Sequence, residues 1–524
     1  MDMTCSLENT GVMQSETPVP HSRLSWLLPD AALMVGILTL LICLFLFDGT
    51  QKLFRDSDSG WHIRTGEAIL SGSGLPHSDP YSLLRRGQSW FAWEWGADVL
   101  MGAAHRLDGM SGVALLYGVA IGACSWFWFR LHWAVGGNFL IAGAMATLMV
   151  STANLHWLAR PHVFGWLFLL GSVWYAETAG GRTSKRSIAA AMLFGALWAN
   201  MHASFFLAPL IALIYGFSHL LRPLIWQLDR AAEWSRARFF AVIAAAALAG
   251  GFVNPYGWQL HRHVIAYLSN SELLDRIGEF QSFNFHVEGS FQILLCVGLA
   301  ALGGVVALGQ RNLAHFLLSA VFLALALRSA RALPLVALIL LPIANSSISK
   351  ALAAAEGLQP ALQRTLASFL QYSMNLRTID AGLRGYVVAP VAVFLVFAAL
   401  HAPAVQARTG FPPAEFPVEA SLVLEKLPSD IRLLAPDKFG GYLIYRFNGT
   451  RPVFFDGRSD FYGSAYMKDY LRLVEVRPGW RELLDRDRFT HALLPNQYSL
   501  IPALQQLGWK EKYKDGTATL LEKQ

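Results

Sequence analysis

The chain has 524 residues, of which 54% are hydrophobic and only 15% are charged, and its mean hydropathy is +0.38. Soluble domains carry about 25% charged residues, so the composition excludes a protein whose whole surface faces water. The net charge of +6 would suit nucleic acid, but the basic residues lie between apolar segments and not on one basic face. The sequence therefore predicts basic loops that orient a membrane protein, and no nucleic-acid partner.

The first apolar run, at 31–47, follows a tail whose charged residues are acidic apart from Arg23. The tail lacks a basic start and a small-residue cleavage site, so the run is predicted to be a retained spanning helix and residues 1–26 a cytoplasmic tail. Residues 27–403 are predicted to form a mostly α, polytopic membrane helix bundle of about eleven helices in the lipid bilayer. The later apolar runs lie near residues 111–129, 138–151, 163–178, 188–200, 203–221, 239–253, 290–308, 312–327, 332–348 and 386–402.

Loop charges predict how this bundle is oriented. With a cytoplasmic N-terminus, the basic loops at 182–186, 222–238 and 350–384 fall inside, in agreement with the positive-inside rule. The long first loop, 48–95, argues against this orientation, because it is also rich in Lys and Arg but would lie outside. The predicted location is the cell inner (cytoplasmic) membrane, crossed several times.

The residue composition of the sequence changes after about Phe411, where a proline-rich linker begins. Short strand-like runs then alternate with helical ones, which predicts a small α/β domain over residues 404–524, outside the cytoplasm. The predicted strands lie at residues 432–435, 442–445, 452–455, 491–494 and 517–521.

Polar residues gather in the loops that this topology places outside. Ionisable groups at the ends of apolar helices are costly and indicate function. Because several separate loops supply them to the same side, the sequence predicts one polar cavity at the outer membrane surface. Its candidate residues are Asp56, Asp58, Trp61, His62, Glu94, Trp95, Arg160, His162, Asn200, His202, Asn254, Glu279, Arg328 and Arg331.

The acidic candidates permit more than one interpretation. Asp58 or Ser59 would satisfy the first N–H groups of a helix over 60–70 as a cap. Alternatively, Asp56 and Asp58 supply a general base or metal-binding carboxylates, so no cofactor is certain and a divalent metal stays open. His62 and the other histidines have no metal-ligand spacing, which favours hydrogen bonding in loops.

The basic and amide candidates are interpreted in the same way. Arg328 and Arg331 lie one turn apart beside the predicted cavity, which favours binding of a phosphate or pyrophosphate over simple anchoring. Arg160, before a proline, is either an interfacial anchor or a ligand for an anionic headgroup. Asn254 begins an Asn-Pro-Tyr-Gly segment that is typical of a turn closing a helix.

Several motifs carry a resemblance to a known class of proteins: residues 56–67 (DSDSGWHIRTGE), 79–82 (DPYS), 93–95 (WEW), 198–202 (WANMH), 254–257 (NPYG) and 456–460 (DGRSD). With the order of the predicted parts, they resemble the GT-C class of membrane glycosyltransferases, and more closely an uncharacterised bacterial polytopic membrane family of that shape. The resemblance implies transfer of a sugar from a polyprenyl-phosphate carrier to an unknown acceptor, an envelope glycan, lipid or protein. It also implies that Asp58, or else Asp56, is the catalytic base, that Arg328 or Arg331 holds the carrier phosphate, and that Trp61 and other aromatic residues shape the sugar site.

Two other functions stay open at this point. A transporter or flippase of a lipid-linked saccharide would need polar residues through the bilayer midplane and related halves, whereas most ionisable residues here lie at one surface. A non-catalytic scaffold for envelope polysaccharide assembly would keep the same architecture with a degenerate site.

Overall fold

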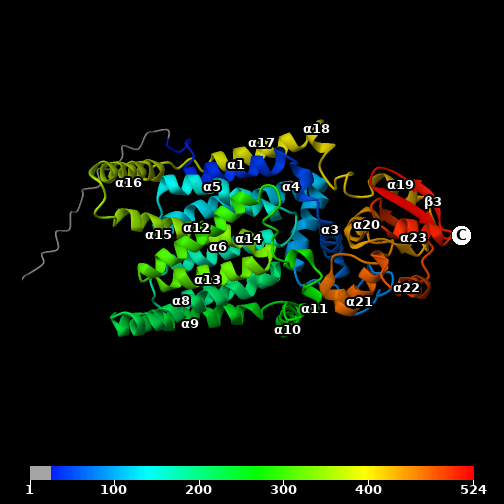
Figure 1. The fold of residues 1–524 in the computed structure, drawn as a ribbon, viewed down its shortest axis with the longest axis horizontal. Helices are drawn as coiled ribbons and strands as arrows, with labels where there is room; N and C mark the ends of the chain where they lie inside the picture. Colours follow the sequence, from blue (N-terminus) through cyan, green and yellow to red (C-terminus); the bar gives the residue numbers. More distant parts are fainter. Residues whose placement is uncertain (1–24) are drawn as a thin grey trace, which may run out of the picture.

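A computed structural model describes residues 25–524. Residues 1–24, and with them most of the predicted cytoplasmic tail, lie outside the described residues. The helices of the bundle run along the long axis of the molecule, and the C-terminal domain sits at one end (Figure 1). We call this end the domain end, and the other the opposite end.

Each apolar run of the sequence coincides with a helix. Within residues 25–524, five helical segments are long and apolar enough to cross a membrane: Trp95–Ala134, Phe139–His156, Ala203–Ile225, Ser290–Gly309 and Ala330–Ala353. Others are shorter, so the chain is mostly helical with several apolar helices, and about eleven spans stays a prediction. The helices of the bundle are α1 (Ala31–Phe45), α4 (Trp95–Ala134), α5 (Phe139–Ala153), α6 (His162–Thr178), α7 (Lys185–Met201), α8 (Leu207–Ile225), α9 (Arg230–Gly251), α12 (Ser290–Gly309), α13 (Leu313–Arg328), α14 (Leu333–Leu335), α15 (Leu341–Ala353) and α17 (Val388–Leu400).

Small residues let neighbouring helices of the bundle approach closely. A Cβ atom added at Gly195 of α7 would lie 2.1 Å from the backbone oxygen of Ala247 in α9, and one at Gly250 of α9 would lie 2.0 Å from that of Met192. Helices in lipid gain no hydrophobic drive from associating, so close van der Waals contact through small residues stabilises the pair.

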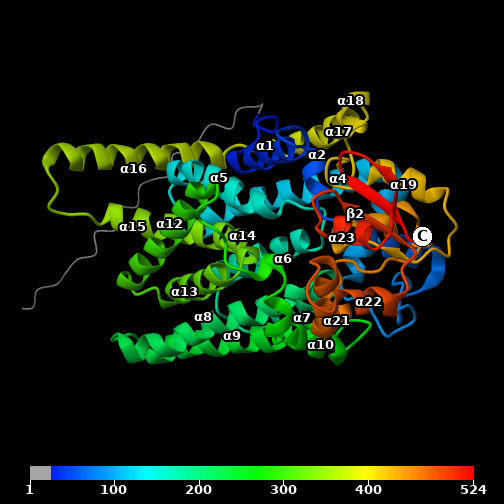
Figure 2. The ribbon, with the colours of Figure 1, turned by 45° about the vertical axis from the view of Figure 1, so that its right-hand side comes forward.

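Shorter elements join or cap the bundle. At the domain end lie α2 (Thr50–Leu53), α3 (Asp58–Ala68), α10 (Trp258–Leu268), α11 (Ser271–Leu274) and α18 (Pro403–Gln406). The long α16 (Pro360–Ala381) projects from the opposite end beside α15 (Figure 2).

The C-terminal domain is a four-stranded sheet with helices around it. The strand order is β1-β2-β4-β3, with β1 parallel to β2 and the other neighbouring pairs antiparallel. The elements are α19 (Val418–Glu425), β1 (Leu433–Leu434), α20 (Asp437–Arg446), α21 (Ser459–Val474), α22 (Trp480–Asp487), β2 (His491–Pro495), α23 (Leu500–Gln506), β3 (Lys510–Lys514) and β4 (Ala518–Glu522).

Three of the predicted strands are confirmed in part or whole, and two are wrong. Residues 442–445 belong to α20. The two glycines before them, Gly440 and Gly441, have no side chain, so the helix can pack closely against Asp456 and α3. Residues 452–455 form only an isolated bridge, between Val453 and Ser82. The exposed edge strand β3, with the sequence KEKYK, had no hydrophobic pattern to predict it.

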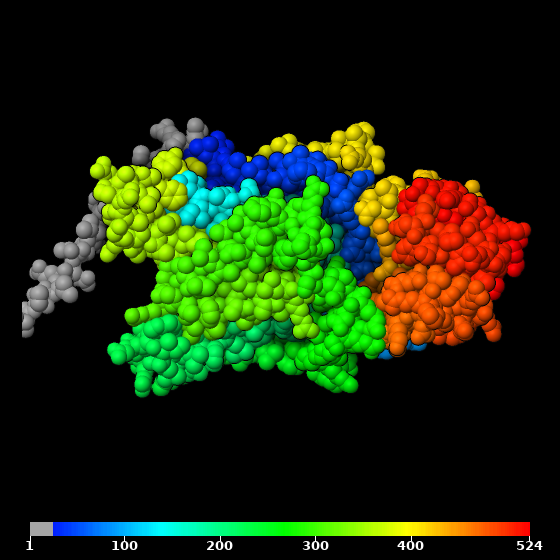
Figure 3. Space-filling view, viewed as in Figure 1, coloured from blue at the N-terminus to red at the C-terminus, as the bar shows by residue number. Residues whose placement is uncertain are grey.

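The C-terminal domain packs directly on the first loop and on α10–α11 (Figure 3). Helix α20 meets α3 so closely that a Cβ atom at Gly60 would lie 2.1 Å from the backbone oxygen of Gly441. In addition, the buried Arg458 pairs with Asp79 of the first loop at 2.6 Å. The domain is therefore fixed over the end of the bundle, where the predicted polar loops converge.

Candidate active site

Asp58 lies in the first turn of α3, and its side chain is used for an ion pair and not for capping. The N-cap position of α3 makes no side-chain capping bond. The backbone N–H of Asp58 donates to Asp56 Oδ1 at 2.9 Å, whereas Asp58 Oδ2 pairs with Arg160 Nη2 at 2.9 Å. Ser59 Oγ donates to the carbonyl of Ala159 at 2.9 Å. The capping interpretation of Asp58 and Ser59 is therefore wrong.

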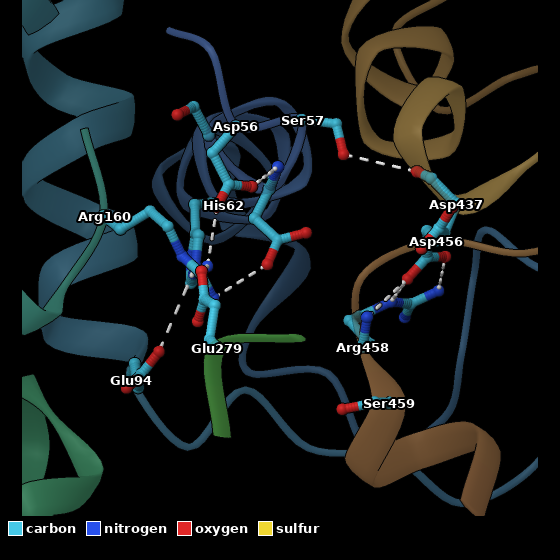
Figure 4. Close-up of polar contacts among 12 residues, drawn as sticks. Asp56, Ser57, His62, Glu94, Arg160, Glu279, Asp437, Asp456, Arg458 and Ser459 are labelled. Atoms are coloured by element: carbon cyan, nitrogen blue, oxygen red, sulfur yellow. Dashed lines mark hydrogen bonds and ion pairs between the residues drawn. The ribbon is translucent and has the colours of Figure 1, made fainter. Parts of the chain in front are cut away.

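Arg160, in the turn before α6, binds carboxylates from two distant segments (Figure 4). Its Nη1 atom lies 2.7 Å from Asp56 Oδ2 and 3.4 Å from Glu279 Oε1. The other oxygen of Glu279 pairs with Arg331 Nε at 3.1 Å. We call Asp56, Asp58, Arg160 and Glu279 the Arg160 site.

Glu94, at the start of α4, lies between two imidazole rings. Its carboxylate oxygens are 3.3 Å from His202 Nε2 and 4.0 Å from His62 Nε2. The other ring nitrogen of His62 is hydrogen-bonded to Asp98 Oδ1 at 2.5 Å. Asp98 is fully buried and, within residues 25–524, its second oxygen has no hydrogen-bond partner. This pair fixes the ring of His62 behind the site.

The C-terminal domain contributes backbone and side chains to the same place. Gly457 lies against the carboxylate of Asp58, since a Cβ atom at this glycine would be 1.8 Å from Asp58 Oδ1. The next residue, Arg458, is held by Asp456 at 2.7 Å and by Asp79 at 2.6 Å. The loop at 456–460 is thereby anchored, and only glycine fits at its contact with Asp58.

Helix α10 supports this loop from the side of the bundle. His263 Nε2 lies 3.0 Å from Asp460 Oδ2, and the hydroxyls of Tyr267 and Ser459 are hydrogen-bonded at 3.1 Å. These contacts join α10 to the start of α21 and close one side of the site.

Burial and charge give the carboxylates of the site different proton affinities. Burial raises the pKa of Asp58 to about 7, even though Arg160 opposes the rise. Burial likewise raises the pKa of Glu94 to about 7 against the opposing charge of Arg160. Burial of Glu279 would also raise its pKa, but Arg331 and then Arg160 outweigh it and lower the pKa to about 2. Asp58 and Glu94 can therefore exchange protons near neutral pH, whereas Glu279 stays ionised.

A cavity of about 190 Å³ lies in front of these groups. An adjoining cavity of about 410 Å³ shares part of its wall, including His162, His202 and Arg331. The second cavity has mostly apolar walls, among them Trp166 and Leu325, and carries Arg328 on its lining. We refer to these two adjoining cavities together as the hollow. The first is lined by carboxylates, arginines and imidazoles, and the second is mostly apolar with two arginines.

The structure brings most of the predicted site residues to this hollow, but not all of them. Trp95 Nε1 donates to Asn200 Oδ1 at 2.7 Å, and the amide of Asn200 also bonds the carbonyl of Val253. Asn254 bonds its own turn, where Oδ1 accepts from Tyr256 N at 2.8 Å. The predicted residues on the walls of the two cavities are Asp58, Trp61, His62, Glu94, Arg160, His162, His202, Arg328 and Arg331, and Asp56 and Glu279 stand behind them through Arg160.

Several residues of the site were not among the predicted ones. The segment DGRSD at 456–460 stood out in the sequence as a polar turn, but nothing in it indicated that Gly457 reaches Asp58. Tyr267 carried no signal, because its contact with Ser459 spans 192 residues of sequence.

Whether the site has room for a metal ion is answered by its donor set. Within the described part of the chain, residues 25–524, no group of three or more His, Cys, Asp or Glu side chains is arranged to hold a metal. Asp56, Asp58 and Glu279 do converge, but they converge on the guanidinium of Arg160, which takes the place between them. The residues present do not fit a divalent ion at this position.

Comparisons with known proteins bear on the fold. No protein-family model matches the chain, and no curated protein matches it by sequence. Among solved structures it is similar to the archaeal oligosaccharyltransferase AglB from Archaeoglobus fulgidus in complex with an inhibitory peptide and a dolichol-phosphate. The TM-score is 0.56 and the identity 11%, over 88% of this chain and 69% of that one.

Two further structures of the Archaeoglobus fulgidus oligosaccharyltransferase give similar values. The apo form matches with a TM-score of 0.51 at 10% identity, over 88% of this chain and 69% of that one. The complex with Zn and sulfate matches with a TM-score of 0.52 at 10% identity, over 89% and 68%. At this identity the likeness shows the fold alone, which the chain shares with the archaeal oligosaccharyltransferase, a membrane glycosyltransferase of the GT-C type. Together with the apolar helices, it identifies the chain as an integral membrane protein.

Proposed function

We propose that this chain is a GT-C-type glycosyltransferase that moves a sugar from a polyprenyl-phosphate carrier to an envelope glycan, lipid or protein acceptor. One observation carries the proposal: the cavity lined by the carboxylates Asp58 and Glu94 adjoins a mostly apolar cavity lined by Arg328 and Arg331, and Arg331 lines both. A lipid-linked donor needs both environments, because its phosphate requires cations and its prenyl chain requires apolar walls. The archaeal neighbour with a dolichol-phosphate and a peptide has this overall fold and supports a lipid-linked donor with a separate acceptor.

In the proposed reaction, the acceptor hydroxyl gives its proton to Asp58 while its oxygen bonds to the anomeric carbon of the sugar. The bond between that carbon and the phosphate oxygen breaks, and the lipid phosphate leaves with the electron pair. A base works best when its pKa lies near the working pH, and that of Asp58 is about 7. Guanidiniums held in place before the reaction stabilise the charge that develops on the leaving phosphate.

Arg331 is the better placed of the two arginines for this task. It lines both cavities, and its Nε atom is fixed on Glu279 at 3.1 Å. Because Nε makes that contact, the two terminal nitrogens of Arg331 do not take part in it. Arg328 lines only the apolar cavity and is assigned to the side of the carrier phosphate that bears the prenyl chain.

The proposed topology places this hollow on the outer face of the inner membrane, with the N-terminus cytoplasmic and the domain at 404–524 outside. The positions of the loops support it. The basic loops at 182–186 and 222–238 connect α6 to α7 and α8 to α9 at the opposite end of the bundle. The site and the C-terminal domain share the domain end (Figure 1). The bundle at 27–403 and the soluble domain are proposed as the two functional parts.

The test is sugar transfer by the full-length protein, purified in lipid nanodiscs and supplied with polyprenyl-phosphate sugars and candidate acceptors. We expect product with wild type and a loss with Asp58→Asn that exceeds the loss with Asp56→Asn. Equal transfer by wild type and Asp58→Asn would refute Asp58 as the base. Movement of a lipid-linked saccharide across vesicles without any transfer would indicate a transporter instead.

A further inference from the structure

The guanidinium of Arg160 sits where three carboxylates converge. Asp56 and Asp58 come from the first loop and the start of α3, and Glu279 comes from a segment more than a hundred residues further along the chain. The ion-pair distances to Arg160 are 2.7, 2.9 and 3.4 Å. Only 16% of the Arg160 side chain is exposed. Carboxylates held this close together in a partly buried site repel one another unless a cation lies between them.

The sum of the charges shows how far Arg160 neutralises the three carboxylates. When ionised, the three carboxylates carry −3, and Arg160 with Arg331 supplies +2, so the group is left with −1. Without Arg160 the same group would carry −3 + 1 = −2, the charge that one divalent cation neutralises. Oxygen ligands from carboxylates are also those that hard divalent cations prefer. Arg160 therefore stands in a position that would otherwise attract such an ion.

We propose that Arg160 is the permanent, protein-supplied cation of this site and that the site takes no divalent metal ion. The role of this cation in the reaction rests on the proposed function. The planar guanidinium gives one nitrogen to Asp58 and the other to Asp56 and Glu279, so it fixes the direction of the Asp58 carboxylate as well as its charge. Arg160 is a positioning residue, because it acts through Asp58.

The experiment measures Mn²⁺ binding to the full chain in nanodiscs by the loss of the EPR signal of the free ion. It needs no turnover, so its outcome is separate from that of the transfer assay. We expect no saturable binding by wild type. We expect Arg160→Ala to bind about one Mn²⁺ per chain and to unfold at a higher temperature with Mn²⁺ than with EDTA, because a ligand that binds only the folded state stabilises it.

Two controls define the site. Arg331→Ala is the matched variant, because it also removes an arginine from Glu279 but touches neither aspartate; it should bind no Mn²⁺. Adding Asp56→Asn and Asp58→Asn to Arg160→Ala should abolish the new binding. If Arg160→Ala does not fold, Arg160→Gln replaces it, since the amide keeps a hydrogen-bond donor and removes the charge. Saturable Mn²⁺ binding by wild type that Asp58→Asn removes, or no binding by a folded Arg160 variant, would overturn the proposal.

Discussion

The two ends of the bundle each contain carboxylates that are at least partly buried, but the surroundings of these carboxylates differ. At the opposite end, Glu177 of α6 accepts a hydrogen bond from the Tyr215 hydroxyl and lies 2.8 Å from His315 Nε2. Nearby, Glu233 of α9 pairs with Arg222 at 2.9 Å. Each of these carboxylates has only hydrogen-bond donors as polar neighbours. Polar groups that only hold helices together are arranged in this way.

At the domain end the balance is reversed, because acceptors outnumber donors. Asp56, Asp58 and Glu279 share Arg160, and Glu94 has only imidazole neighbours within ion-pair distance. Of these groups, Asp58, Glu94 and Arg160 line a cavity of about 190 Å³. Burial raises the pKa of Asp58 and of Glu94 to about 7, and both carboxylates line the cavity, where a substrate can reach them. We therefore assign function to the domain end and a structural role to the Glu177 cluster (Glu177, Tyr215 and His315).

The largest expected difference between the ends comes from one isosteric change at each. Asp58→Asn removes the proposed base and should lower the rate of sugar transfer by about 10²–10⁴-fold, the usual contribution of general base catalysis. Glu177→Gln should leave the rate within about threefold and lower the melting temperature instead, since a buried hydrogen-bonded pair is broken. Both rates are measured at saturating donor, and melting by intrinsic fluorescence in nanodiscs.

This pair of variants also indicates how the comparison fails. If Glu177→Gln lowered the rate as much as Asp58→Asn, the two ends would be coupled in the reaction. The assignment of function to the domain end alone would then be wrong. If Asp58→Asn melted well below wild type, its loss of rate would reflect unfolding, and the comparison would then be repeated with Asp58→Glu.

A smaller effect is expected from the arginine at the boundary of the two cavities. Arg331→Ala should raise the KM for a polyprenyl-phosphate sugar and lower kcat/KM by about 10–100-fold, because a charge-assisted contact to phosphate is lost. Arg222→Ala, which breaks an ion pair at the opposite end, is the control and should leave KM unchanged. An unaltered KM in Arg331→Ala would place the carrier phosphate elsewhere.

Sequence reasoning recovered the parts that depend on composition and on local order. Apolar runs such as 290–308 are helices within a residue or two, because a long apolar segment has no other way to satisfy its backbone in lipid. The gathering of Asp58, Arg160 and Arg331 followed from topology alone, since helices that cross in alternation return their loops to the same side.

The misses come from contacts between segments far apart in the chain. The high β-propensity of residues 442–445 predicted a strand, but this segment is part of a helix that packs through Gly441 on α3. Asn200, predicted as a site residue with His202, bonds Trp95 and the carbonyl of Val253, and neither contact could be read from the sequence. No local pattern shows which partner a side chain finds across a hundred residues.

A further way to sharpen the comparison is to disturb the domain end without removing a polar side chain. Gly457→Ala would place a methyl group against Asp58 Oδ1, where a Cβ atom has only 1.8 Å, so the loop at 456–460 must shift. We expect a loss of about tenfold in kcat/KM, in line with the effect of small misplacements at catalytic groups. Gly516→Ala, in the same domain and with open space around it, should behave as wild type. Equal activity of the two variants would show that the loop does not complete the site.

The smallest expected effect is a pH-dependent change in stability at Glu94. Burial raises its pKa from 4.5 to about 7, so between these values the folded protein holds a proton that the unfolded chain has released. Stability must therefore fall as the pH rises from about 4.5 to 7 and stay lower above it. Glu94→Gln cannot ionise and lacks this loss, so it should gain stability over wild type on the order of 1 kcal/mol at pH 8 and little at pH 5. Melting temperatures of both proteins in nanodiscs across this range decide it. A difference that is constant with pH would mean that Glu94 ionises in the folded protein as it does in water, and burial would then not raise its pKa.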